Sequence, residues 1–397
     1  MTQTDIFGYL YPNYKIRNPI RLIELFAGVG TQAMALRDLG VKFERWKTCE
    51  WDYHAILSYA AIHCADDKND YSSALDDLAL ANSLYQLGIS ADGKSQMELA
   101  SIKRLLEKKK RKIYNAIMAS HNMVNIISAT ADDLKITDTD RYEYIMTYSF
   151  PCQDLSLAGR GKGMEKGSGT RSSLLWEVER ILLELKERNE LPQVLVMENV
   201  PEVIGAKNYQ HFMEWYASLE RMGYQSYYKL LNAKDYGVPQ SRNRCFMVSI
   251  LGDYNYTFRE PMPLKRRLRD VLESEVDERY YLSDKATAYL LDNKDRGGMI
   301  RAKKVEFKDE DSILANTITT MQRGYSPFDN FIIHSNGFNK RIRKFTPFEC
   351  WRLMDFTDED FYKAQAVNSN TQLYKQAGNG IVKAVLMAVF KEILGKE

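Results

Sequence analysis

The stretch RLIELFAGVG, residues 21–30, decides the fold of this chain. Its apolar first half predicts a buried strand at 21–26, and its two glycines predict a tight turn into a helix. A second strand is predicted at 43–49, and it delivers Glu50 at its end. Glycines that let the backbone approach a ligand, followed about 20 residues later by a carboxylate, are typical of a nucleoside-binding α/β fold.

The rest of the chain extends this pattern. Further strands are predicted at 123–128, 142–148, 193–197, 225–231 and 244–250, and helices at 173–188, 209–222 and 380–394. This order predicts an α/β protein with a Rossmann-like domain. The polar, helix-prone residues 64–122 carry no strand pattern and predict a helical insertion. From 253 to 344 short β-like or irregular pieces with clustered basic residues predict a smaller second domain.

Composition indicates an ordinary globular protein. The 397 residues suggest two domains, with 45% hydrophobic and 27% charged residues. The chain has no apolar run long enough to span a bilayer and no basic start followed by an apolar core, so we expect a cytoplasmic protein. Its five cysteines contain no CxxC pair, and its histidines have no ligand spacing, so neither a disulfide framework nor a metal is expected.

The net charge of +2 does not by itself indicate a nucleic-acid partner, but basic residues cluster locally. The runs at 265–269 and 340–344 could contact phosphates or form a solvated surface. The run at 103–112 is typical of an exposed helix in the insertion. This segment could bind additional DNA, or it could decorate the surface, which its pattern favours.

A cysteine follows the predicted strand at 142–148. It lies in SFPCQ, residues 149–153, and the segment after it, 155–171, is rich in glycine and basic residues. Ligands of open α/β sheets bind beyond the carboxyl ends of the strands, so Cys152 is well placed for chemistry. A free cysteine is also commonly a small buried hydrophobe, so the assignment depends on the other motifs.

Six separated motifs have the order found in one known family. They are FAGVG (26–30), SFPCQ (149–153), MENV (197–200), QSRNR (240–244), RKFTPFECWRLMDF (343–356) and QAGNGIVKAVL (376–386). The first four resemble, in order, the cofactor loop, catalytic cysteine, catalytic glutamate and arginine motif of DNA (cytosine-5) methyltransferases of bacterial and phage type. The resemblance spans residues 21–386 apart from the insertion and much of the second domain.

This resemblance implies a catalytic set that the chemistry of C5 methylation also requires. Cys152 would add to C6 of a cytosine flipped out of double-stranded DNA, which makes C5 nucleophilic. Its thiol needs a lowered pKa for this task. Glu198 near N3 and Arg244 near O2 would stabilise the charge that develops on the ring. Arg242 belongs to the same motif, where support of the loop is the simpler role.

The resemblance also implies S-adenosylmethionine as methyl donor, with no metal. The matching cofactor-binding residues are Phe26, Gly28, Gly30, Glu50, Trp51, Asp132, Pro151 and Asn379. Glu50 would hold the ribose, and Phe26 and Trp51 would lie against the adenine. The adjacent aspartates leave the adenine-side acid open between Asp132 and Asp133, and we favour Asp132.

The domains follow from the same comparison of motifs. Residues 1–252 would form the catalytic and cofactor-binding domain, 253–344 the target-recognition domain, and 345–397 a return segment that completes the catalytic domain. The loop after Cys152 would close over the flipped base. The candidate DNA contacts are Gln153, Arg160, Lys162, Arg171, Gln322 and Arg323. We expect a monomer that acts in a restriction–modification system, beside a separate endonuclease, or as a solitary enzyme.

Three other classes of protein share parts of this pattern of motifs. A zinc cytosine deaminase requires P-C-x-x-C, and Leu155 occupies the position of the second cysteine. An RNA cytosine-5 methyltransferase shares the catalytic set, and only the long segment before RKFTPFEC favours DNA over RNA. A non-catalytic regulator with this fold would be expected to have lost Cys152, Glu198 or Arg244, and all three are present.

Overall fold

The computed structural model describes residues 11–152, 154–155, 163–264, 266–291, 307–309, 311–320, 330–336 and 339–396. The chain divides into two compact units. Unit 1 comprises Met1–Leu231, Asn243–Glu260 and Leu386–Glu397, and unit 2 comprises Asn232–Arg242 and Pro261–Val385.

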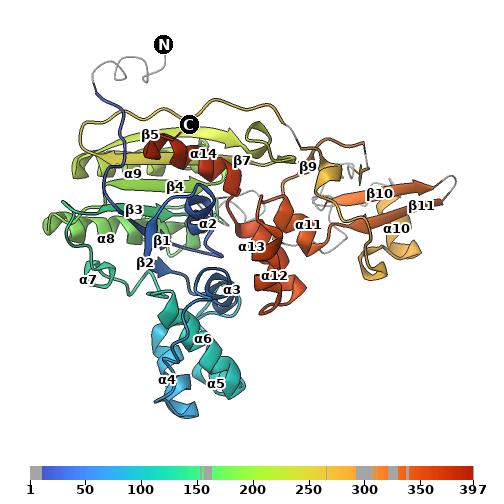
Figure 1. The fold of residues 1–397 in the computed structure, drawn as a ribbon, viewed down its shortest axis with the longest axis horizontal. Helices are drawn as coiled ribbons and strands as arrows, with labels where there is room; N and C mark the ends of the chain where they lie inside the picture. Colours follow the sequence, from blue (N-terminus) through green and yellow to red (C-terminus); the bar gives the residue numbers. More distant parts are fainter. Residues whose placement is uncertain are drawn as a thin grey trace. The chain divides into compact units, whose positions relative to one another are not determined.

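Unit 1 is built on one mixed sheet with the strand order β2-β1-β3-β4-β7-β5 (Figure 1). Its strands are β1 Ile20–Leu25, β2 Phe43–Cys49, β3 Glu143–Tyr148, β4 Val194–Asn199, β5 Tyr224–Asn232 and β7 Asn243–Leu251. The first four pair in parallel, and β7 runs antiparallel to β4. Every residue of β3 and β4 is buried, as expected of central strands with helices on both faces.

The helices of unit 1 cover this sheet and form the insertion. They are α2 Thr31–Asp38, α3 Tyr53–His63, α4 Asp77–Leu87, α5 Leu99–Lys103, α6 Glu107–Ala119, α7 Ala131–Leu134, α8 Leu175–Glu187, α9 Tyr209–Met222 and, from Leu386 onward, α14 Lys383–Leu394. Figure 1 shows α2 and α14 on the near face, with α8 and α9 behind. One buried core joins α8 and α9 to β1, β3 and β4. The predicted α/β fold is confirmed.

One predicted strand is wrong. Residues 123–125 have no regular structure and residues 126–128 form a turn, although the run is mostly apolar. The Asn122 side chain accepts a hydrogen bond from the Val124 amide at 2.8 Å, and that of Asn125 accepts one from the Ile127 amide at 3.0 Å. Amide groups that are satisfied locally in this way are not free to join a ladder.

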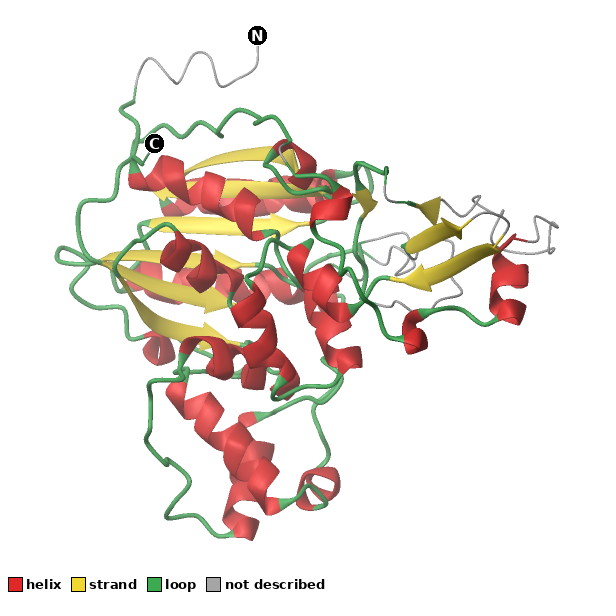
Figure 2. Cartoon of the chain, turned by 45° about the vertical axis from the view of Figure 1, so that its right-hand side comes forward, coloured by secondary structure: helices red, strands yellow, loops and turns green. Residues whose placement is uncertain are grey.

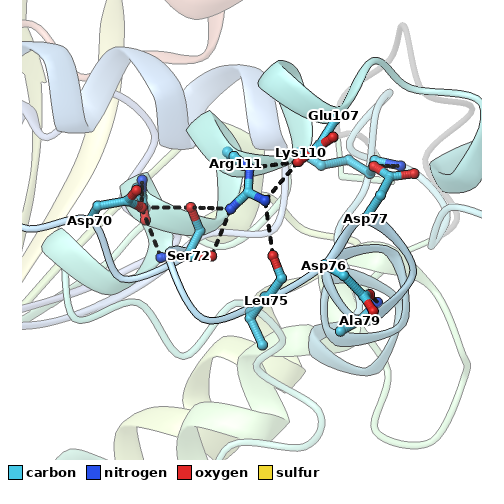
Figure 3. Close-up of polar contacts among 10 residues, drawn as sticks. Asp70, Ser72, Leu75, Asp76, Asp77, Ala79, Glu107, Lys110 and Arg111 are labelled. Atoms are coloured by element: carbon cyan, nitrogen blue, oxygen red, sulfur yellow. Dashed lines mark hydrogen bonds and ion pairs between the residues drawn. The ribbon is translucent and has the colours of Figure 1, made fainter.

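The insertion is helical, as predicted (Figure 2), and its helix α6 packs against α3. Its helices are tied together by charged side chains of α6 (Figure 3). The Arg111 guanidinium donates to the carbonyls of Ser72 at 2.7 Å and Leu75 at 2.9 Å, while buried Lys110 pairs with Asp77 at 2.5 Å. The basic run is therefore partly structural, since two of its cations hold the preceding loop and helix.

Unit 2 contains short strands, as expected from the pattern. Its elements are β6 Gln240–Ser241, α10 Asp284–Leu291, β8 Phe307–Lys308, β9 Ala315–Asn316, β10 Phe331–Asn336, β11 Asn339–Lys344, α11 Pro347–Arg352, α12 Asp358–Gln365 and α13 Asn370–Asn379. The strands form a β11-β10-β8 sheet and a β6-β9 pair. Thr346 and Glu349 form the predicted capping box at the start of α11. None of the described helices is both long and apolar enough to cross a membrane.

The two units differ in extent from the predicted domains. Residues 345–385 belong with unit 2, whereas the sequence assigns them to the return segment, and unit 1 resumes only at Leu386. A buried ion pair accounts for part of this difference. The Arg343 guanidinium, at the end of β11, donates to both carboxylate oxygens of Glu349 in α11 at 2.8 and 2.9 Å, which ties 345–352 to the small sheet.

Candidate active site

Three neighbouring strands of unit 1 bring the candidate catalytic residues to one edge of the sheet. Tyr148 ends β3 opposite Met197 of β4, and Asn199 of β4 lies opposite Cys245 of β7. Because β7 is antiparallel, its first residues lie beside the last residues of β4. The segment after β3, the end of β4 and the start of β7 therefore meet.

The Glu198 carboxylate is held on both sides at this edge. Ser149 donates a hydrogen bond to its Oε2 at 2.8 Å, and the Arg244 guanidinium lies 3.3 Å from its Oε1. The Glu198 side chain is 7% exposed and that of Arg244 16% exposed. A nearly buried carboxylate fixed by two partners is suited to meet one face of a ligand in a single orientation.

Cys152 lies in the loop that continues from Ser149, and it is half-buried. Two side chains hold this loop by its carbonyls. Asn199 donates to the Phe150 carbonyl at 3.0 Å, and Ser172 donates to the Pro151 carbonyl at 2.6 Å. The sequence did not indicate these anchors or Ser149, because each contact joins residues that are far apart in the chain.

The Glu50 carboxylate organises the turn after β1. Its two oxygens accept hydrogen bonds from the backbone amides of Gly28 at 3.0 Å and Asp52 at 2.8 Å. Burial, followed by the nearby charge of Asp52, raises the pKa of Glu50 to about 7. Asn122, which the sequence did not identify, accepts from the Glu50 amide and donates to its carbonyl, both at 3.0 Å.

The two glycines of this turn differ. Both have positive φ, +55° at Gly28 and +79° at Gly30, as the left-handed turn requires. A Cβ on Gly28 would meet nothing within 4 Å, so its face is open to a ligand. A Cβ on Gly30 would lie 2.6 Å from a ring carbon of Tyr59 and closer still to His63. Gly30 is therefore needed where α3 packs against the turn.

The other predicted cofactor residues of unit 1 lie in varied surroundings. Phe26, with φ of +57°, directly follows β1 and packs partly buried against the core, and Trp51 is half-buried after Glu50. Pro151 is half-buried in the cysteine loop. The exposed Asp132 pairs with Arg188 at 2.5 Å, and Asp133 caps α7 through Thr130. Both aspartates are thus engaged in local structure.

Two predicted residues belong to unit 2. The buried Arg242 guanidinium donates to the carbonyls of Ile318 at 2.8 Å and of Gly378 and Gly380 at 2.9 Å. Contacts of this kind are typical of a residue that supports the surrounding backbone, the simpler role that the sequence favours for Arg242. Asn379 is exposed at the end of α13.

The remaining predicted DNA contacts are distributed unevenly. Arg171 is half-buried beside the cysteine loop, with its amide donating to Asp154 at 2.8 Å. Gln153, Arg160, Lys162, Gln322 and Arg323 lie outside the described residues. Among the described residues, no group of three or more histidine, cysteine, aspartate or glutamate side chains could hold a metal ion.

A family model of C-5 cytosine-specific DNA methylases matches residues 95–395. The chain belongs to this family, and it is a DNA (cytosine-5) methyltransferase. It is 34% identical to the type II methyltransferase M2.ScrFI of Lactococcus lactis subsp. cremoris, over 94% of this chain and 99% of that protein. It is 32% identical to the orphan methyltransferase M.SssI of Spiroplasma monobiae, over 95% and 97%.

Solved structures support the fold. The Schizosaccharomyces pombe Dnmt2 methyltransferase matches with a TM-score of 0.61 and 17% identity, over 95% of this chain and 98% of that one. An Entamoeba histolytica methyltransferase, EhMeth, matches with a TM-score of 0.64 and 15% identity, over 96% and 99%. At these identities the likeness is one of fold.

Proposed function

We propose that Cys152 is the nucleophile of this methyltransferase, and that Glu198 and Arg244 stabilise the activated cytosine. The observation that carries this proposal is the fixed Glu198 carboxylate, held by Ser149 and Arg244 at the edge of the sheet from which the Cys152 loop leaves. These residues come from three different strands or strand ends and share one region of unit 1.

The proposed reaction starts when the Cys152 thiolate forms a bond to C6 of a flipped cytosine, which moves electron density toward C5 and N3. Glu198 shares a proton with N3, while the Arg244 guanidinium balances the carboxylate and the charge near O2. After C5 has gained the methyl group, loss of its proton lets the S–C6 bond break and frees Cys152. The C5 proton passes to solvent, and the completed cycle returns Cys152, Glu198 and Arg244 to their starting states.

S-adenosylmethionine is the proposed methyl donor, and when bound it supplies an electrophilic methyl group to C5. The turn around Gly28 fits such a ligand, because it combines open space at the glycine with a carboxylate at Glu50 that can accept hydrogen bonds from ribose hydroxyls. Phe26 and Trp51 are proposed to contact the adenine. Asp132 and Asp133 remain the alternative acids for its amino group, although both have local partners.

We further propose that double-stranded DNA is the substrate, read by the segment 253–344, and that the chain acts as a monomer in the cytoplasm. The names of its type II and orphan relatives support either a restriction–modification role, with a separate endonuclease, or a solitary one. The candidate contacts Gln153, Arg160, Lys162, Gln322 and Arg323 stay predictions.

The test is cytosine conversion sequencing of unmethylated genomic DNA after incubation with purified protein and S-adenosylmethionine. We expect protected cytosines in one short sequence context. Cys152→Ala should abolish protection, while Cys245→Ala, which changes a buried cysteine of β7, serves as the matched control and should retain it. Protection by the Cys152→Ala protein would refute the nucleophile, and methylation of RNA but not DNA would refute the substrate.

A further inference from the structure

The helical insertion sends one loop back to the candidate active site. This loop, residues 89–98, connects α4 to α5, and its anchor is Ser90, which is fully buried. The Ser90 amide donates to the Trp51 carbonyl at 2.7 Å, and the Ser90 carbonyl accepts from the Tyr53 amide at 2.9 Å. The loop is therefore joined by its backbone to the segment that directly follows Glu50.

The Ser90 hydroxyl shapes the tip of this loop. It accepts a hydrogen bond from the Gly93 amide at 2.9 Å and donates one to the Ser95 carbonyl at 2.6 Å. Asp92 adds a second closure, because its Oδ1 accepts from the amide of Lys94 at 2.8 Å. Gly93, with φ of +67°, is buried at the tip. The direction of its carbonyl is thus set by contacts within the loop.

That carbonyl binds Arg171. The Arg171 Nη2 donates to the Gly93 carbonyl at 2.6 Å, and the Arg171 amide donates to Asp154 at 2.8 Å, two residues beyond Cys152. The next residue, Ser172, holds the Pro151 carbonyl at 2.6 Å. Arg171 and Ser172 thus bind the residues on either side of Cys152. The insertion holds the Arg171 side chain.

Several ionisable groups surround the Arg171 guanidinium. Burial lowers the pKa of Arg171, and the neighbouring Asp154, Asp92 and Cys152 act against that lowering. The contacts of the Arg171 amide with Asp154 and of Ser172 with the Pro151 carbonyl hold this residue next to the loop that carries Cys152. A cation near a thiol favours the thiolate over the thiol.

We propose that the insertion is a working part of the active site, in which the loop 89–98 positions the Arg171 guanidinium beside Cys152 and so activates the thiol. The same loop links this cation to the backbone next to Glu50. The inference rests on the proposed role of Cys152, and it gives the insertion and Arg171 roles that differ from the predicted surface decoration and phosphate contact.

The test compares two buried serines of the same insertion. Ser90→Ala removes the hydroxyl that shapes the Gly93 turn. Ser72→Ala, the matched control, removes a fully buried hydroxyl that bonds Asp70 and Arg111, both outside that loop (Figure 3). For each protein, the rate of Cys152 alkylation by iodoacetamide is followed by mass spectrometry from pH 6 to 9.5, without DNA or cofactor.

We expect Ser90→Ala to slow alkylation at pH 7.5 about fivefold, the effect of losing the hydrogen bond between Arg171 and Gly93. The midpoint of the pH profile should move to higher pH. Ser72→Ala should match the parent protein. Arg171→Met, which removes the charge, should raise the midpoint of the profile by about one pH unit. A parental profile for either Ser90→Ala or Arg171→Met, at unchanged thermal stability, would overturn the inference.

Arg171→Lys keeps the charge but loses the planar group that reaches Gly93, so it tests positioning even if Ser90→Ala folds poorly. It should give an upward shift smaller than that of Arg171→Met, and a parental profile would show that the insertion does not position the charge. Methyl transfer by Cys152→Ala is measured in parallel. Activity in that variant would refute the proposed function itself, whereas its loss beside unshifted profiles would refute only this inference.

Discussion

At the scale of single residues, Cys152 differs from the other cysteines in its surroundings. Cys49, Cys64, Cys245 and Cys350 are buried, and burial raises the pKa of each thiol, to about 11 at Cys64 and about 12 at Cys245. We therefore expect iodoacetamide at pH 8 to label Cys152 alone in the native protein and all five cysteines in denaturant. Peptide mass mapping checks this, and labelling of Cys64 before Cys152 in the native protein would contradict it.

Ser149 is the residue whose loss should separate positioning from stability. Without its hydrogen bond the Glu198 carboxylate keeps its Arg244 partner but loses the second contact that orients it, so Ser149→Ala should lower kcat by roughly fivefold to tenfold. Ser218→Ala removes an equivalent buried serine–glutamate contact, to Glu179 at 2.7 Å, and should leave kcat unchanged. Steady-state methylation assays with both variants decide, and equal losses of kcat would argue against a role for Ser149.

At the scale of elements, the turn between β1 and α2 gives two glycines with separable effects. Gly30→Ala combines left-handed backbone, roughly 1–2 kcal/mol, with a clash against α3, roughly 1–3 kcal/mol, so we expect about 3 kcal/mol of lost stability. Gly28→Ala should cost only about 1 kcal/mol but weaken S-adenosylmethionine binding. Urea unfolding and calorimetric titration measure the two effects. The reverse order of stabilities would contradict this assignment.

The sequence predicted the elements whose pattern and local chemistry agree. The strand at 43–49 and the helix at 209–222 have the predicted bounds, and the capping box of Thr346 and Glu349 starts its helix as expected. The strand at 123–128 failed because the side chains of two asparagines satisfy nearby amides, and hydrophobic pattern alone does not register such competition.

The candidate site was predictable to a similar degree. Motif order predicts Cys152, Glu198 and Arg244 as catalytic residues, and the structure brings the last two together. Motif order did not indicate the contacts of Asn122 with Glu50, of Ser149 with Glu198 or of Gly93 with Arg171. Each of these contacts joins residues 49 or more positions apart. Such contacts depend on how elements pack, and no local pattern encodes them.

At the scale of the whole molecule, Glu24 in β1 should make stability depend on pH. Burial raises its pKa to about 7 from 4.5, although Tyr59 and the Ala33 amide act against this by hydrogen bonding to it. Between these values the folded protein retains a proton that the unfolded chain has released, so stability falls as pH rises. The shift corresponds to about 3 kcal/mol.

Urea unfolding between pH 4.5 and 8 measures this loss. Glu24→Gln, which cannot ionise, should make the decline smaller and be more stable than the parent at pH 8, and the remaining decline is expected from Glu50, whose pKa is also raised to about 7. Glu187→Gln, which changes an exposed carboxylate of α8, should leave the slope unchanged. Equal slopes for Glu24→Gln and the parent would exclude Glu24 as the titrating group.

Unit 1 also contains both ends of the described chain. The Ile16 amide donates to the Ile393 carbonyl at 3.0 Å, and Arg259 pairs with Glu392 at 2.8 Å. During synthesis, these contacts can form only after the ribosome has translated α14 and released it from the exit tunnel. The face of the sheet that α14 covers therefore stays exposed until synthesis has passed through the last residues of unit 2. A nascent chain arrested before Leu386 would be a natural client for a chaperone, even though every strand of the large sheet has already been synthesised.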